Sequence, residues 1–559
     1  MDVRIIGGVL LVCAIVVVAG VLFYDYDFNT PGVNDNVNPG NTTDDDTTNT
    51  STDQTVLTLL PDGSTGFTPN PSPGPSPGPS PGPGPTPTPT PDYDKIIEMF
   101  DEYLQSIFPQ SHVPGMAVAI VHDGKVIYLK TLGVRNVTSG EGVTPDTLFQ
   151  IGSLSKAFTA TYIAQLVDNG TLNWNDIIND KYPYQLTGDL QNTLTIGDAL
   201  SHSSGLPMYS GNTNWIAFNE SYDSILSKFS NVIPEGPFPK YEYNNIIYTL
   251  PAYLAEKLTG TTWFDAVTQN LLRPLDMNTA VTNTTDFLNS PNYAASYKYT
   301  AMGDLVEWHP VNIDTVGPSG SMGASINDMI NWLKFQLADT GYYNGVQIVS
   351  KENLDETKTG HIDMGGNQMY GYGWIVGNNG IIAHSGSTVS SESTIALYTS
   401  NGTGIVILTN QYALGMALHS ALFVKFSNLI NGINSTDSWP ALRDAYYVPY
   451  TTPAGYTPSP YPFSNYIGVY NNAFYGKINV TVVNNGTNDN LVFYYGNNSV
   501  PFTLRHDNCT VFMDDANLAS FEFANITNGK ADKLLMSDRD PTLPAPVGTP
   551  TEFNRTPNT

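Results

Sequence analysis

The sequence predicts an α+β fold in which an antiparallel sheet is flanked by helices, followed by a small all-β barrel. Strand-like runs stand at both ends of the first unit with helical segments between them, which implies a sheet built from both ends of the unit with helices against it. Short alternating runs separated by turn residues then fill residues 463–539. A period of two without a competing helical period is typical of an antiparallel barrel or sandwich.

The first unit begins with a helix predicted over Asp92 to Phe108, because its apolar side chains recur on one helical face. Two strand-like runs follow, and Asp123-Gly124 between them is a strong hairpin signal. Leu414 to Ile430 is predicted to be the closing apolar helix. The predicted strands of this unit are residues 116–121, 125–133, 381–383, 393–399 and 404–410.

Residues 1–28 contain an unbroken apolar run, Ile5 to Tyr24, long enough at about 1.5 Å per residue to cross a hydrocarbon core of ~30 Å. We expect a single-pass transmembrane signal anchor in the cell membrane here. Arg4 before the run and acidic residues after it favour an orientation with the bulk of the chain outside the cytoplasm. A cleaved signal peptide is the alternative and would give a secreted protein.

Residues 29–91 consist largely of Asn, Asp, Thr, Pro and Gly and end in a Pro-rich repeat. Such a segment cannot bury enough apolar surface to fold, and its prolines favour an extended polyproline conformation. We therefore expect a disordered stalk. A Pro- and Tyr-rich stretch at residues 437–462 is predicted to be a connector, and residues 540–559 are predicted to be a loose tail.

The 559 residues include 51 Asp and Glu against 23 Lys and Arg, for a formal net charge of −28. This composition provides no basic surface for phosphate contacts, so nucleic acid is not an expected partner. Two cysteines and eight scattered histidines give no disulfide framework and no recognisable metal-ligand spacing. The sequence predicts no metal and no cofactor, and it leaves the oligomeric state open.

A serine and a lysine three residues apart open a helix predicted from about Ser153 to Asp168. Residues at i and i+3 share one helical face, so the Ser153 hydroxyl and the Lys156 amine are within reach of each other. This pair fits a serine nucleophile whose proton passes to a lysine held neutral by desolvation. The pattern alone is weak, because a capping serine and a solvated lysine produce it too.

Tyr243 and Asn245 form a Tyr-x-Asn pair ahead of an apolar helix. A phenol near a serine and a lysine can relay protons, and a carboxamide can orient the lysine and contact a substrate amide. A loop followed by a helix cap is the alternative for this segment.

His384-Ser385-Gly386 ends a predicted strand. A glycine there lets the backbone approach a substrate, and the backbone N–H of Ser387 could complete an oxyanion hole with that of Ser153. A histidine with an ordinary structural hydrogen bond is the alternative.

The order and spacing of these three segments resembles the serine β-lactamase-like hydrolases related to class C β-lactamases and penicillin-binding proteins. The resemblance spans about Asp92 to Ile430 and includes IGDALSHSSGLP at 196–207 and GPSGSMGASINDMINWLKFQL further on. It implies an antiparallel sheet flanked by helices, a mostly helical lobe, and a hydrolase domain over residues 92–436. Residues 463–539 resemble the lipocalin-like barrel appended to some peptidases of that family.

The resemblance implies Ser153 as the acylated nucleophile, Lys156 as its base partner and Tyr243 as the proton relay. Substrate-binding roles are implied for Asn245, His384, Ser385 and Gly386. The implied protein is a serine hydrolase that forms an acyl-enzyme with a small-molecule or peptide substrate and needs no cofactor. The alternative is a non-catalytic ligand-binding or surface-interaction protein on the same fold.

His384 stands where many members of that family carry a lysine. A neutral side chain holds a substrate carboxylate less strongly, which favours ester or small-peptide cleavage over penicillin hydrolysis. A literal K-T-G occurs at Lys358-Thr359-Gly360, but it precedes a glycine-rich, loop-like stretch. We therefore assign the third segment to His384.

Overall fold

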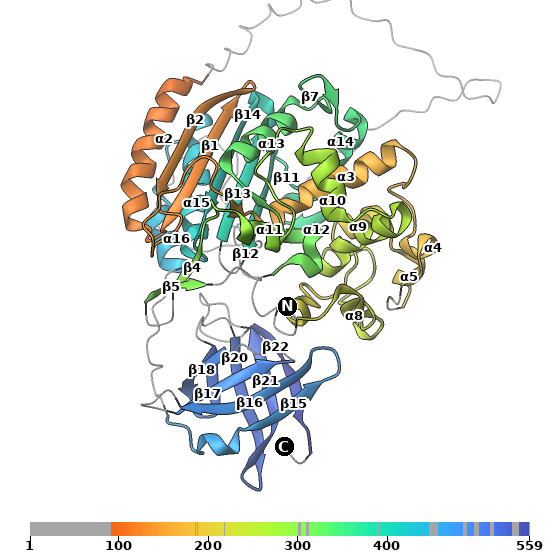
Figure 1. Cartoon of the computed structure of the whole chain (residues 1–559), viewed down its shortest axis with the longest axis vertical. Coiled ribbons are helices and arrows are strands. Elements are labelled where there is room, and N and C mark those ends of the chain that lie inside the picture. Colours follow the sequence, from red (N-terminus) through yellow and green to blue (C-terminus); the bar gives the residue numbers. More distant parts are fainter. Residues whose placement is uncertain are drawn as a thin grey trace, which may run out of the picture. The chain divides into compact units, whose positions relative to one another are not determined.

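The computed structural model describes residues 91–557, with gaps at 185, 187, 217–218, 300–302, 309–311, 389–390, 447–456, 485–488, 497–501, 515–518 and 539–546. From Asp92 onward the described residues belong to one compact unit (Figure 1). The predicted anchor or signal peptide and almost all of the predicted stalk, residues 1–90, lie outside the described residues.

Within the described part of the chain, no helix combines the length and the apolar character needed to cross a membrane. This finding contradicts the prediction of a transmembrane signal anchor. The segment on which it rested, Ile5 to Tyr24, lies outside the described residues.

The first part of the fold is an antiparallel sheet of eight strands in the order β2-β1-β14-β13-β12-β11-β10-β9. The strands are β1 (Gly115–His122), β2 (Lys125–Gly133), β9 (Ile362–Gly365), β10 (Gln368–Tyr370), β11 (Ile375–Gly377), β12 (Ile381–Thr388), β13 (Ser391–Tyr398) and β14 (Thr403–Thr409). Because β1 pairs with β14, the two ends of the unit meet in one sheet, as the sequence predicts.

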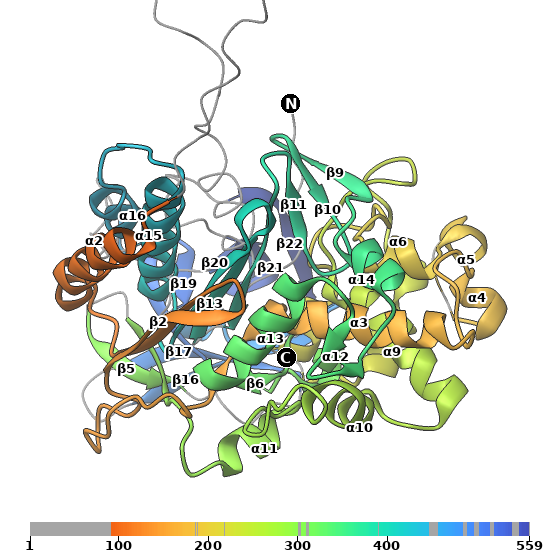
Figure 2. The same ribbon diagram turned by 90° about the horizontal axis from the view of Figure 1, so that it is seen from above.

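Both faces of this sheet are covered. Along β1, Ala117 and Ala119 belong to the core beneath α3 (Ser155–Asp168) and α13 (Ile326–Ala338). Met116 and Val118 belong to the core beneath α2 (Tyr93–Ile107) and α15 (Leu414–Ile430). This alternation explains why the β1 sequence reads as a continuous apolar run. The two layers of helices stand on opposite sides of the strands (Figure 2).

Among the described residues, the helices with seven or more residues are α2 (Tyr93–Ile107), α3 (Ser155–Asp168), α9 (Asn245–Thr259), α13 (Ile326–Ala338), α14 (Lys351–Thr357), α15 (Leu414–Ile430) and α16 (Trp439–Tyr446). The predicted first helix is confirmed as α2, with Asp92 as its N-cap and Ile96, Phe100, Leu104 and Ile107 buried. The predicted closing helix is confirmed as α15.

A mostly helical lobe connects the two ends of the sheet. Its shorter helices are α4 (Ile178–Lys181), α5 (Leu190–Thr193), α6 (Ile196–Leu200), α7 (Asn212–Ile216), α8 (Tyr222–Leu226), α10 (Trp263–Val267), α11 (Thr284–Asn289) and α12 (Gly317–Gly320). Three short two-stranded pairs accompany them: β3 (Phe149–Gln150) with β6 (Gly323–Ala324), β4 (Ser296–Tyr299) with β5 (Leu305–Trp308), and β7 (Tyr342–Tyr343) with β8 (Val346–Gln347). The fold class predicted from the sequence is thus confirmed.

The C-terminal part is an antiparallel sheet of eight strands that curls into a barrel, in which β22 pairs back with β15. The strands are β15 (Gly468–Asn472), β16 (Gly476–Asn484), β17 (Asp489–Tyr495), β18 (Phe502–Asn508), β19 (Val511–Asp514), β20 (Ala519–Thr527), β21 (Lys530–Asp538) and β22 (Val547–Arg555). Aromatic and aliphatic side chains such as Tyr470, Phe493 and Phe553 fill its own core.

The final stretch differs from the prediction. Residues 540–559 are predicted to be a loose tail, but they contain β22, which pairs with β21 and β15. Phe553 of this strand is fully buried in the barrel core. The high Pro and Thr content hides this strand, because strand propensity depends on the packing and pairing that a segment finds in the fold.

Candidate active site

Ser153 lies in a 3₁₀ turn, Gly152–Leu154, directly before α3, and Lys156 lies in the first turn of α3. The helix therefore begins two residues later than predicted. The turn needs glycine at 152, where φ is +51° and a Cβ would lie 2.8 Å from the backbone nitrogen of Ser387. The Lys156 Nζ lies 3.1 Å from the Ser153 Oγ, within hydrogen-bond distance, as the spacing predicts.

The Tyr-x-Asn segment meets this pair. Asn244 caps α9 by accepting from the backbone N–H of Ile247, which places its two neighbours in the sequence at the serine and the lysine. The Tyr243 hydroxyl donates to the Ser153 Oγ at 2.9 Å, and the Asn245 Oδ1 accepts from the Lys156 Nζ at 2.8 Å. Four of the predicted site residues therefore share one hydrogen-bonded cluster.

A backbone carbonyl completes the surroundings of the lysine. The Ser319 oxygen in α12 accepts from the Lys156 Nζ at 2.8 Å, and Thr159 holds the same turn through the Pro318 oxygen at 2.6 Å. Ser319 is not among the predicted site residues. The glycine-rich segment GPSGSMG marks the turn, but no side-chain pattern indicates that a main-chain oxygen faces the site.

Burial sets the electrostatics of the cluster. Lys156 has 0% of its surface exposed, and burial lowers the pKa of its amine well below the ordinary value. A neutral amine can donate its two protons to Asn245 Oδ1 and Ser319 O while its lone pair accepts the Ser153 proton. Burial raises the pKa of Tyr243 well above its ordinary value, so the phenol stays protonated. The geometry therefore suits a neutral lysine as the base for the serine.

His384 takes a different position from the other predicted residues. Its Nε2 pairs with the Tyr370 hydroxyl at 2.9 Å, and its Nδ1 pairs with the Ser385 oxygen at 2.6 Å. Burial lowers the pKa of His384 to about 3. The imidazole is neutral and both of its nitrogens have protein partners, although its ring centroid lies 6.5 Å from that of Tyr243.

The strand that carries His384 also reaches the nucleophile. Gly386 packs against the turn so closely that a Cβ would lie 2.0 Å from the Ile151 oxygen. Ser387 and Ser153 both line a small cavity. Asn245 and Ser319 line the same cavity. Ser153 and Ser387, whose backbone N–H groups are predicted to form an oxyanion hole, thus line the same cavity.

The literal K-T-G motif lies elsewhere and is structural. Lys358 is largely buried and donates to the carboxylate of Asp339 and to the Gln336 oxygen. Across the described residues, no group of three or more His, Cys, Asp or Glu side chains is arranged to hold a metal ion.

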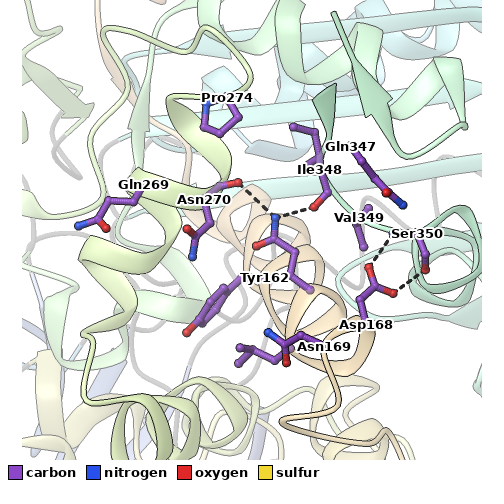
Figure 3. A pocket seen from close by; sticks show the side chains of 12 residues that line it. Tyr162, Asp168, Asn169, Gln269, Asn270, Pro274, Gln347, Ile348, Val349 and Ser350 are labelled. Carbon is purple, nitrogen blue, oxygen red and sulfur yellow. Dashed lines mark hydrogen bonds between the residues drawn. The ribbon is translucent and has the colours of Figure 1, made fainter. Parts of the chain in front are cut away.

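A larger, open cavity of about 680 Å³ lies near the opposite end of α3 (Figure 3). Amide side chains such as Gln269, Asn270 and Gln347 line it, and Asp168 accepts from the Ser350 N–H and hydroxyl at 2.6 Å each. None of the predicted site residues is among the residues that line it.

Fold and cluster together define the class of serine β-lactamase-like proteins, in which a serine and a lysine at the start of a helix face a tyrosine beside an antiparallel sheet. The chain belongs to the Beta-lactamase family, whose model matches residues 94–421.

Two curated proteins are similar to this chain in sequence. Protein flp of Staphylococcus aureus (strain MW2) is 28% identical over 319 residues, which cover 56% of this chain and 63% of that protein. Unguisins hydrolase ungD' of Aspergillus campestris is 29% identical over 266 residues, or 44% of this chain and 47% of that protein. The matched part thus spans less than two thirds of either relative.

The octameric penicillin-binding protein homologue from Pyrococcus abyssi matches 79% of this chain and 98% of its own, with a TM-score of 0.52 and 22% identity. At this level of identity the likeness concerns the fold alone.

Proposed function

We propose that this protein is a serine hydrolase that acts on ester or amide substrates through an acyl-enzyme. One observation carries the proposal: the Ser153 Oγ lies within hydrogen-bond distance of both the Lys156 Nζ, at 3.1 Å, and the Tyr243 hydroxyl, at 2.9 Å. A nucleophile in contact with a desolvated amine and a protonated phenol has both a base and an acid at hand.

In the proposed reaction the Ser153 Oγ attacks the substrate carbonyl carbon while its proton passes to the neutral Lys156 amine. The backbone N–H groups of Ser153 and Ser387 would bind the tetrahedral oxyanion. When the intermediate collapses, the bond to the leaving alcohol or amine breaks and Tyr243 gives that group a proton, which Lys156 restores. Water then attacks the acyl-enzyme by the same route, so that no net proton is gained or lost.

The surroundings favour uncharged ester or small-peptide substrates. The small cavity beside Ser153 is lined by apolar and neutral polar residues, including Trp215, Ile313 and Val316. His384 is neutral and bonded to Tyr370, so it offers little attraction for a substrate carboxylate. A relative from Aspergillus campestris that bears the name of a hydrolase supports hydrolysis as the general chemistry.

The domain limits belong to the same proposal. Residues 92–436 would form the hydrolase domain and 437–462 a connector. The barrel that follows, extended by β22 beyond its predicted end at residue 539, would be the lipocalin-like appendage.

A substrate screen of the full-length chain tests this function. We expect turnover of at least one substrate among p-nitrophenyl esters, D-amino-acid peptides and nitrocefin. Ser153→Ala should abolish this turnover. Lys156→Met should lower the rate by about 10²–10⁴-fold, the usual contribution of a general base. The matched control is Lys358→Met, which removes a largely buried lysine outside the cluster and should leave turnover in place. Turnover that survives Ser153→Ala would contradict the proposal.

A further inference from the structure

A buried carboxyl group lies behind the proposed oxyanion hole. Glu392 is on β13 with only 1% of its surface exposed, and its partner in the ladder on β12 is Ser387. The Ser387 hydroxyl donates to the Glu392 Oε1 at 2.7 Å. Burying a carboxyl group costs free energy unless hydrogen bonds compensate it, so this position calls for a physical explanation.

The Glu392 side chain is enclosed on its other side by α15. A Cβ placed on Gly415, in the first turn of that helix, would lie 3.3 Å from the Glu392 Cβ and 3.4 Å from its Cγ. The neighbouring strand holds the main chain, because the Thr409 hydroxyl donates to the Glu392 oxygen at 3.1 Å. The neighbouring strand, α15 and the cross-strand serine therefore surround the Glu392 side chain.

The β12–β13 strand pair contacts the turn that carries the nucleophile. Ser393, next to Glu392, donates its hydroxyl to the Ile151 oxygen at 2.9 Å. The backbone nitrogen of Ser387 lies so close to Gly152 that any Cβ there would be only 2.8 Å away. A small shift of Ser387 would therefore move its N–H relative to Ser153.

Burial raises the pKa of Glu392 well above its ordinary value, while contacts with the Ser387 hydroxyl and the Ala413 N–H act in the opposite direction. A neutral carboxyl group still accepts from a serine hydroxyl through its carbonyl oxygen. It also places no negative charge behind a site where an oxyanion develops.

We propose that Glu392 is a positioning residue for acyl transfer: its buried carboxyl group holds Ser387 so that the Ser387 N–H points at the oxyanion. This inference rests on the proposed function, because it gives a role only to a chain that acylates Ser153. An apolar residue of similar volume would pack at least as well against α15, so packing alone does not account for a carboxyl group.

The test measures the rate at which a fluorophosphonate labels Ser153 in the full-length chain, over a range of probe concentrations. Glu392→Leu removes the acceptor for the Ser387 hydroxyl, and we expect its maximal labelling rate to fall by about 10–100-fold, since misplacing one group by about 1 Å can cost 10²-fold. The probe concentration for half-maximal rate should stay within about threefold. Glu392→Gln keeps an acceptor and should recover most of the lost rate.

Two further variants keep the test decisive. Ser387→Ala keeps the backbone N–H but loses the hydroxyl, so its labelling rate should fall by a similar factor to that of Glu392→Leu. The double variant should be no slower than the slower single variant, because both substitutions remove the same interaction. Lys358→Met removes a largely buried lysine outside the cluster and serves as the control with an unchanged rate. If Glu392→Leu does not fold, Ser387→Ala and Glu392→Gln carry the comparison.

Wild-type labelling rates in both Glu392→Leu and Ser387→Ala would overturn the positioning role and leave the proposed function intact. Equal losses in Glu392→Leu and Glu392→Gln would also overturn it, because the acceptor would then be irrelevant. No labelling of the wild-type protein would overturn the proposed function, and this inference with it.

Discussion

The charge state of Lys156 decides whether this site can work as described, and Lys156→Met exposes that state. In the unfolded chain this lysine has its ordinary pKa of 10.5, whereas burial lowers the pKa of the folded group. Between the two values the unfolded chain binds the extra proton. The contribution of Lys156 to the free energy of unfolding is therefore most favourable above pH 10.5. It becomes less favourable as the pH falls toward the pKa of Lys156 in the folded chain.

The magnitude follows from the structure. If the folded amine is fully neutral at pH 7, removing its proton costs about 5 kcal/mol at most. Lys156→Met removes this cost but leaves Asn245 Oδ1 and Ser319 O without their donor, at about 1–3 kcal/mol each. These contributions nearly cancel at pH 7. The pH dependence does not cancel: the wild-type chain should gain up to about 1.4 kcal/mol per pH unit relative to the variant.

Urea unfolding followed by tryptophan fluorescence measures this dependence. All seven tryptophans lie between Trp174 and Trp439, so the signal reports the Ser153-containing part of the chain and not the barrel. From pH 7 to pH 9 we expect the stability of the wild type to rise relative to Lys156→Met by up to about 3 kcal/mol. Parallel curves would mean that Lys156 is protonated in the folded protein and would refute the neutral-base reasoning.

Three further predictions concern the rate of Ser153 acylation. Tyr243→Phe removes the hydroxyl that donates to Ser153, and kcat should fall by about 10²–10⁴-fold, as expected for the loss of a general acid. Gly152→Ala places a Cβ 2.8 Å from the Ser387 nitrogen at a φ of +51°, and both the labelling rate and the melting temperature should fall. In the pH–rate profile, kcat should rise as Lys156 loses its proton, without an inflection near 6.5 from His384, whose pKa is about 3.

Each of these three predictions would be refuted by a specific result. Unchanged kcat in Tyr243→Phe would remove the phenol from the proton path. A Gly152→Ala protein with wild-type melting temperature and rate would show that the turn can move away from Ser387. A kcat that keeps rising from pH 7 to pH 9 would mean that Lys156 is still protonated at pH 7 and would contradict a neutral lysine base.

The sequence predicted what repeats locally or spans one helical turn. The i, i+3 spacing of Ser153 and Lys156 was enough to predict their contact, and a hydrophobic face was enough to predict α2. The order of the motifs added Tyr243 and Asn245, which spacing alone could not place, because 90 residues separate Tyr243 from Ser153.

Contacts made by the main chain or by distant buried groups escaped the sequence analysis. Ser319 contributes a backbone oxygen, which leaves no side-chain signature. Glu392 reads as an ordinary polar residue in a strand until the ladder places it opposite Ser387. His384 was predicted to face the substrate, but its hydrogen bonds to Tyr370 and to the Ser385 oxygen depend on tertiary packing.

The central claim is that Ser153 is a nucleophile, and covalent labelling tests it most directly. The full-length chain is treated with a fluorophosphonate, and the modified residue is located by tandem mass spectrometry. One adduct per chain on Ser153, lost in Ser153→Ala and strongly slowed in Lys156→Met, is the predicted result. An unlabelled chain, or an adduct on another serine that persists in Ser153→Ala, would contradict it.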